Sequence, residues 1–169
     1  SFYSHKWLET SSNFCNKIWN VHKFFLMNFN KFNFNNSVSI DLSNEQLYSI
    51  FDRWILIQLN KTVVEVRKNL DNYHLNDASK LIYSFFWTVF CDWYIEISKV
   101  NMNSENINAI RSTLFIIYKV LDISLKLMHP FIPFITEELW QKLPHKSFTN
   151  IDNDKFNTIS LSRYPISLN

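Results

Sequence analysis

The feature that most restricts what this chain can fold into is the complete absence of glycine from its 169 residues. Glycine supplies the positive φ angles of type I′ hairpin turns, and it lets a backbone loop approach a phosphate closely. A P-loop, a Rossmann fingerprint and a sheet built from tight hairpins therefore conflict with this sequence.

Length and composition indicate one globular domain over residues 1–169. Apolar residues make up 47% and charged residues 19%, which suits a chain with a sizeable core. Cys15 and Cys91 belong to no Cys-x-x-Cys pair, and we expect reduced thiols in a cytoplasmic protein. No apolar run approaches the roughly 18 residues of a membrane span, and no signal-peptide core is present, so we expect no membrane contact.

Apolar residues recur every three or four positions, which predicts helices. The predicted helices cover about 7–28, 43–72, 76 to at least 97, 105–129 and 133–143. Ser43 to Gln46 fits a capping box for the second helix, and Ser104 fits an N-cap for the fourth. We therefore predict an all-α fold: an antiparallel bundle of four long helices and a short fifth, with its core at about 7–143. In the polar tail, 145–169, residues 158–164 fit a short strand or a carboxy-terminal extended strap.

Residues 85–97 are dense in aromatic side chains and contain Asp92. A carboxylate buried in such a helix needs a partner, because an unpaired buried charge is costly. We hypothesise a structural ion pair between Asp92 and Arg53, which also lies in an apolar helix. The alternative is that each charge contacts solvent separately. Four large aromatic residues are expected in the core: Trp54, Phe86, Trp93 and Trp140.

The first predicted helix has a polar face that is a candidate RNA-binding site. Its members recur at helical spacing and are accompanied by two further lysines: Asn13, Asn16, Asn20 and Lys23, with Lys17 and Lys31. Asparagine amides can read base edges, and lysines can neutralise phosphates. Phe29, Phe32 and Phe34 in the following segment could stack on unpaired bases. The alternative is a solvated helix face with these aromatic rings packed into the core.

No pattern typical of catalysis or metal binding occurs in the sequence. The five histidines are dispersed, without a His-x-x-x-His pair. A Gly-x-Ser-x-Gly elbow is impossible without glycine. Glu137 and Glu138 fall early in the fifth predicted helix, where carboxylates favour the helix dipole. We therefore predict no catalytic residue, no metal site and no cofactor in this segment.

Four blocks of sequence resemble, in order, the anticodon-binding domain of valyl-tRNA synthetases. They read NFCNKIWN at 13–20, DRWIL at 52–56, YSFFWTVFCDWYIE at 83–96 and HPFIPFITEELWQ at 129–141. The last block also occurs in isoleucyl and leucyl relatives, so the equivalent isoleucyl domain is an alternative. Ser12 departs from the family, which often has arginine there, whereas Lys23 falls where relatives often carry arginine.

The resemblance implies a class I aminoacyl-tRNA synthetase that joins valine to its tRNA with ATP and magnesium. The His-x-Gly-His and Lys-Met-Ser-Lys-Ser motifs of its catalytic domain are absent here, so we expect this chain to be a helical part of a larger enzyme. The implied role is recognition of the anticodon stem-loop. The implied partners are valine tRNA and the catalytic domain of the same enzyme, with no DNA. A freestanding helical protein-interaction module is the alternative.

Overall fold

A computed structural model describes residues 12–32, 48–148, 158–159 and 163–166 of the chain, and these residues form helices and no strand. The elements are α2 (Ser12–Lys31), α3 (Ile50–Asp71), α4 (Leu75–Ser84), the π-helix η2 (Phe85–Ile95), α5 (Glu96–Met102), α6 (Ile107–Met128), α7 (Pro133–Gln141) and α8 (His145–Phe148). The predicted all-α helical bundle is confirmed.

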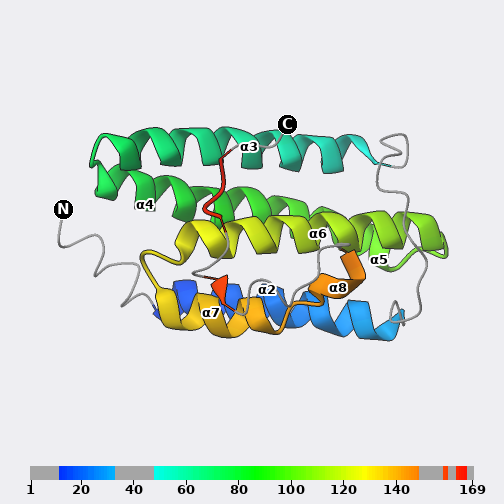
Figure 1. Ribbon diagram of the computed structural model, residues 1–169. Coiled ribbons are helices and arrows are strands. Elements are labelled where there is room, and N and C mark those ends of the chain that lie inside the picture. Colours follow the sequence, from blue (N-terminus) through cyan, green and yellow to red (C-terminus); the bar gives the residue numbers. More distant parts are fainter. Residues whose placement is uncertain (1–11, 33–47, 149–157, 160–162, 167–169) are drawn as a thin grey trace.

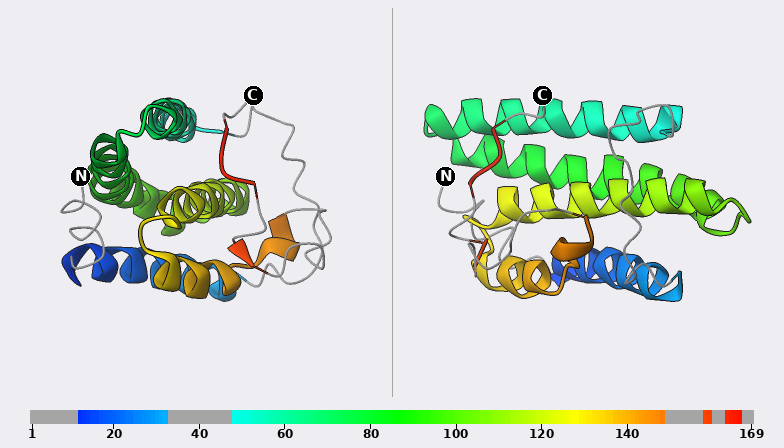
Figure 2. Two further views of the ribbon diagram at one scale, coloured as in Figure 1. Left: turned by 60° about the vertical axis from the view of Figure 1, so that its left-hand side comes forward. Right: turned by 45° about the vertical axis from the view of Figure 1, so that its right-hand side comes forward.

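Four long rods make up the described bundle, because α4, η2 and α5 join into one rod (Figure 1). Successive rods run in opposite directions. Helix α2 therefore runs in the same direction as the third rod, and it packs against the η2 part of that rod. Figure 2 shows α2 and α7 together on one side of α6, with α3 on the other side.

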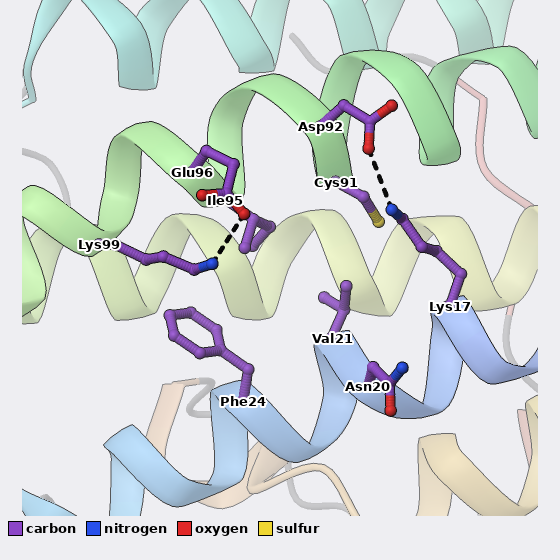
Figure 3. A pocket seen from close by; sticks show the side chains of 9 residues that line it. All are labelled: Lys17, Asn20, Val21, Phe24, Cys91, Asp92, Ile95, Glu96 and Lys99. Atoms are coloured by element: carbon purple, nitrogen blue, oxygen red, sulfur yellow. Dashed lines mark hydrogen bonds and ion pairs between the residues drawn. The ribbon is translucent and has the colours of Figure 1, made fainter.

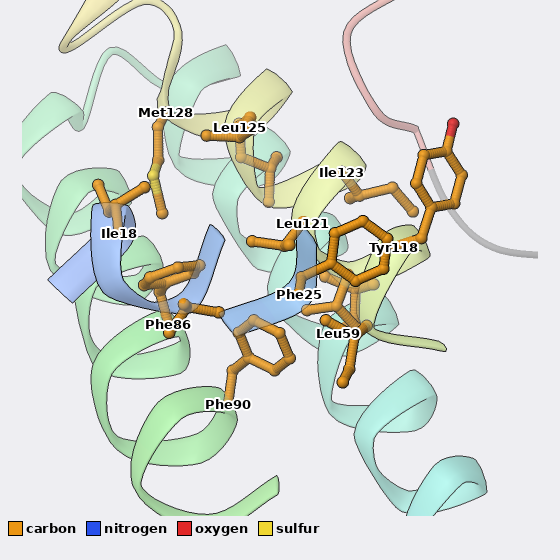
Figure 4. Close-up of a cluster of buried hydrophobic side chains, with 14 of the residues drawn as sticks. Ile18, Phe25, Leu59, Phe86, Phe90, Tyr118, Leu121, Ile123, Leu125 and Met128 are labelled. Atoms are coloured by element: carbon orange, nitrogen blue, oxygen red, sulfur yellow. The ribbon is translucent and has the colours of Figure 1, made fainter. Parts of the chain in front are cut away.

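The central rod is α6, and fourteen of its 22 residues are buried. A helix that is apolar on nearly all sides needs neighbours all round it. Helices α2, α3, α4, α5 and α7 supply these neighbours. The core cluster includes Leu121 and Leu125 of α6, Phe25 of α2 and Leu59 of α3 (Figure 4).

The π-helix η2 changes which aromatic residues enter the core. Phe86, Phe90 and Tyr94 are buried at a constant spacing of four residues. A π turn is wider than an α turn, so side chains spaced by four or five residues share one face, and the seven-residue step from Phe86 to Trp93 leaves that face. Trp93 is therefore 61% exposed, so its predicted core position is wrong. Phe86 is fully buried, as predicted.

Two of the predicted N-caps differ from those in the structure. The expected box at 43–46 lies outside the described residues, and α3 begins at Ile50 with Ser49 as its N-cap. The Ser49 hydroxyl accepts from the Asp52 N–H at 3.1 Å, and the Asp52 carboxylate accepts from the Ser49 N–H at 2.9 Å. This is the Ser-x-x-Asp form of the same capping signal. Asn106, two residues after the predicted Ser104, caps α6.

The tail packs against the bundle without forming a strand in its described residues. The Tyr164 hydroxyl donates to the Leu127 carbonyl at 3.0 Å, and Arg67 donates to the Pro165 carbonyl at 3.2 Å. The segment 163–166 therefore ties α3 to α6 as a strap (Figure 1). The short helix α8 in the tail was not predicted.

Candidate nucleic-acid interface

The polar face of α2 is open to solvent. Its members lie along one stripe of the helix and are all exposed: Asn13, Asn16, Asn20 and Lys23. The opposite stripe of α2 is buried and includes Phe14, Ile18 and Phe25. Helix α2 contains three lysines and no carboxylate. A positive, amide-rich helix face without acidic residues is compatible with a polyanion.

A buried histidine holds α2 against α7 and so orients this face. His22 is 2% exposed, and its Nε2 lies 2.8 Å from the Leu139 carbonyl oxygen. Because a carbonyl only accepts, Nε2 carries the proton. Burial lowers the pKa of His22, and the nearby Lys142 lowers it further. The neutral imidazole is therefore the form that connects the two helices at pH 7.

The structural ion pair of Asp92 is made with Lys17, so the predicted pairing with Arg53 is wrong. Lys17 Nζ lies 3.0 Å from Asp92 Oδ1, and 4.9 Å from the centre of the Trp87 ring. The parallel arrangement of α2 and η2 brings these residues together, while Arg53 is exposed on α3. Asp52, the sequence neighbour of Arg53, is the buried acid of this region, and it accepts a 2.6 Å hydrogen bond from the Tyr94 hydroxyl.

The two described stacking candidates, Phe29 and Phe32, differ in how deeply they are buried. Phe29 is 3% exposed and packs against Phe25 and Phe148, so the stacking role predicted for it is wrong. Phe32 is partly buried against the core, with the exposed Lys31 amine 5.3 Å from its ring centre. Phe34 lies outside the described residues. RNA binding by Phe32 and Lys31 stays a prediction.

One aromatic residue of the face was not predicted. Trp19 is 38% exposed, and Lys142 Nζ lies 5.2 Å from its ring centre. It follows Asn16 by three positions and precedes Lys23 by four, so it shares their side of α2. This spacing was the available signal, because an aromatic residue within a polar stripe offers a stacking surface.

A groove of about 220 Å³ lies beside the α2 face, between α2 and the η2–α5 rod (Figure 3). Asn20 and Phe24 line one side, and Asp92 and Glu96 line the other. Cys91 also lines the groove, and burial raises the pKa of its thiol to about 12. A thiol with so high a pKa is a poor nucleophile at neutral pH.

The described part of the chain offers neither a metal-binding cluster nor a membrane-crossing helix. Within the described residues, no three His, Cys, Asp or Glu side chains gather as a metal site would require. None of the helices in the described ranges combines the length and apolar character that crossing a membrane requires.

Comparison with known proteins identifies relatives that are much longer than this chain. A valine–tRNA ligase of Thermotoga maritima is 48% identical over 139 residues, which cover 82% of this chain and 15% of that protein. Valine–tRNA ligases of Bacillus thuringiensis subsp. konkukian and Bacillus subtilis (strain 168) are 44% and 42% identical over 139 and 144 residues. These matches cover 82% and 85% of this chain, and 15% and 16% of the two ligases.

A family model also matches most of the chain. The model describes the anticodon-binding domain of tRNA ligase, and it matches residues 52–169. Helix α2, which carries the candidate interface, precedes the matched residues. The match covers well over half of the sequence, and this chain therefore belongs to the family of anticodon-binding domains of tRNA ligases.

Proposed function

We propose that this chain is the anticodon-binding part of a valine–tRNA ligase, and that the exposed face of α2 contacts the anticodon stem-loop of valine tRNA. A catalytic domain elsewhere in the same enzyme would attach valine with ATP and magnesium. The observation that carries the proposal is the solvent-exposed, carboxylate-free stripe on α2 of a chain in this family. A cytoplasmic location is part of the proposal.

The α2 face offers the groups that single-stranded RNA requires. Unpaired loop bases are recognised by hydrogen bonds to their edges and by stacking. Asn16 and Asn20 supply exposed amides, and Trp19 supplies a partly exposed ring. Lys23 is an exposed cation on the same stripe. Two or three phosphate contacts to single-stranded RNA give a slope of log K against log salt of about −2.

A second candidate function, a protein-interaction module, is favoured by a different surface. Helix α3 exposes three apolar side chains at spacings of seven residues: Ile50, Ile57 and Val64, with exposures of 77%, 54% and 45%. Such a stripe suits contact with another protein surface. It lies on the other side of α6 from α2, so an RNA titration with α2 variants separates the two functions (Figure 2).

The test compares matched lysine variants on the two sides of the bundle. Lys23→Ala removes an exposed cation from α2, and Lys61→Ala removes one from α3. We expect only Lys23→Ala to weaken valine tRNA binding and to reduce the salt slope by about 1. Filter binding at two salt concentrations measures both quantities.

Specificity is tested with competitors in the same assay. We expect valine tRNA with a scrambled anticodon, and isoleucine tRNA, to bind more weakly than valine tRNA. Equal effects of the two lysine variants would contradict the α2 interface. Equal binding of all three RNAs would contradict anticodon recognition.

A further inference from the structure

Helix α3 carries a second regular stripe, on the side that faces away from the core. Its members follow one another at alternating steps of four and three residues: Ile50, Trp54, Ile57, Lys61, Val64 and Lys68. These alternating steps are the spacing of a coiled-coil seam, along which one helix pairs with another. We call these six residues the outer seam of α3. At a rise of about 1.5 Å per residue, the seam is about 27 Å long.

The outer seam is distinct from the stripe that α3 buries. The buried stripe of α3 consists of Asp52, Ile55, Leu59, Val63 and Val66. The seam residues are exposed, apart from Trp54, which packs partly against the core. Single apolar residues are common on protein surfaces, but here a β-branched aliphatic residue returns at every seventh position. This regular spacing indicates that the seam contacts another helix.

The seam is also positively charged. On α3 between Ile50 and Lys68, the exposed charged residues are three cations and one carboxylate: Arg53, Lys61, Lys68 and Glu65. Lys61 and Lys68 belong to the seam itself, and neither amine forms an ion pair within the described part of the chain. A helix that lies along the seam therefore meets lysines between the aliphatic residues. Carboxylates on that helix would match this charge.

Two other occupants fit the outer seam less well. In a second copy of this chain, the same seam would bring two more lysines into the interface, and like charges at an interface oppose association. A nucleic acid would match Lys61 and Lys68, but Ile50, Ile57 and Val64 offer it neither an aromatic ring nor a hydrogen-bond donor. The combination of aliphatic residues and lysines favours an acidic protein helix.

We propose that the outer seam of α3 binds an acidic amphipathic helix of another protein. The partner packs its aliphatic residues against Ile50, Ile57 and Val64, and it places carboxylates beside Lys61 and Lys68. The proposal gives the second candidate function a class of partner, so it rests on that function and not on RNA binding by α2. Helix α3 lies on the other side of α6 from α2, so RNA and a partner helix can bind together (Figure 2).

The experiment titrates the full chain into a fluorescent synthetic peptide and measures the anisotropy. The peptide contains about three heptads, the length of the seam, with leucine at a and d and glutamate at e and g. Repulsion between the glutamates opposes pairing of the peptide with itself. The matched control peptide carries lysine in place of every glutamate. We expect the acidic peptide to bind about tenfold more tightly, or better, and equal binding of the two peptides would overturn the proposal.

Variants of α3 test which residues provide the binding. Ile57→Asp places a carboxylate in the middle of the seam, so the acidic peptide should bind about tenfold more weakly or worse. Val100→Asp is the control, since Val100 is an exposed aliphatic residue of α5 outside the seam, and binding should not change. Reversing both seam charges, with Lys61→Glu and Lys68→Glu together, should make the chain prefer the basic peptide. Both lysines are exposed, so this variant should fold, and circular dichroism checks this.

The possible outcomes separate this inference from the others. If either Ile57→Asp or the double charge reversal leaves the binding of both peptides unchanged, the outer seam is not the binding site and the inference is overturned. A dimer in sedimentation that Ile57→Asp dissociates would overturn it in favour of a second copy. Valine tRNA is titrated with the same variants. RNA binding that depends on Lys23, without peptide binding, overturns this inference alone, whereas seam-dependent peptide binding by a chain that does not bind the tRNA supports it alone.

Discussion

Helices α6 and α2 are similar in length, but they divide their residues differently between core and solvent. Nearly every side of α6 is buried, and several of its polar residues are buried too, including Ser112 and Thr113. Helix α2 buries one stripe and leaves an amide-and-lysine stripe exposed. A change in α6 must therefore disturb folding, whereas the outer stripe of α2 can change with little effect on stability. The difference indicates that folding and recognition depend on separate residues in this domain.

The largest expected effect is the removal of a core side chain from α6. Leu121 is fully buried in the central cluster (Figure 4). Leu121→Ala removes apolar contacts and leaves a cavity, so the free energy of unfolding should fall by about 2–5 kcal/mol. Urea denaturation monitored by circular dichroism measures this change in the free energy of unfolding.

The matched variant on the outer stripe of α2 is Asn16→Ala. Asn16 is exposed, so the free energy of unfolding should change by less than about 0.5 kcal/mol. A loss of stability as large as that of Leu121→Ala would contradict the separation of folding residues from recognition residues.

Much of the fold could be predicted because its signals are local. The three-and-four spacing predicted the long rods, and Pro133 marked the first residue of α7. The π-helix could not be predicted from an α-helical repeat, because its turn is wider. This is why Phe86, Phe90 and Tyr94 enter the core and Trp93 does not. The constant spacing of four residues in this rod was the available signal.

The candidate site was less predictable because it depends on how the rods are arranged. The polar stripe of α2 was readable from spacing alone. The ion pair between Lys17 and Asp92 needs α2 and η2 side by side and in the same direction, which one sequence does not specify. Phe29 is aromatic, as a stacking residue must be, but Phe148 from a distant part of the sequence packs against it.

The inner side of η2 faces α3. Tyr94 is buried, and its hydroxyl donates to Asp52 Oδ1 at 2.6 Å. Burial and the Asp52 carboxylate raise the pKa of Tyr94, so the hydroxyl keeps its proton. Tyr94→Phe removes a hydrogen bond to a charged group and should lower the free energy of unfolding by about 1.5–3 kcal/mol. The control is Tyr73→Phe, because Tyr73 is 88% exposed and the same atom change should have almost no effect.

The junction of α2 with α7 contains the buried His22. Burial lowers the pKa of both His22 and His145, so the unfolded chain binds protons more readily than the folded one. Stability from these groups is complete above the unfolded pKa of about 6.5 and declines as the pH falls below it. Each histidine contributes at most about 1.4 kcal/mol per pH unit.

His22→Gln keeps an N–H donor for the Leu139 carbonyl but cannot titrate. We expect this variant to lose less stability than the wild type between about pH 7 and pH 5.5 in urea denaturation. His74→Gln is the control, since His74 is exposed at the start of α4. Equal pH slopes in the wild type and the His22 variant would show that the α2–α7 junction is not the titrating element.

The smallest effect is expected for the ion pair between Lys17 and Asp92, which lies between the buried core residues and the exposed stripe of α2. The Lys17 and Asp92 side chains are 29% and 46% exposed, so solvent screens their attraction. A double-mutant cycle with Lys17→Ala and Asp92→Ala should give a coupling energy of about 0.2–1 kcal/mol in the free energy of unfolding. A coupling above about 2 kcal/mol would place this pair with the folding residues of α6. A small coupling means instead that Lys17 can exchange Asp92 for an RNA phosphate at little cost to the fold.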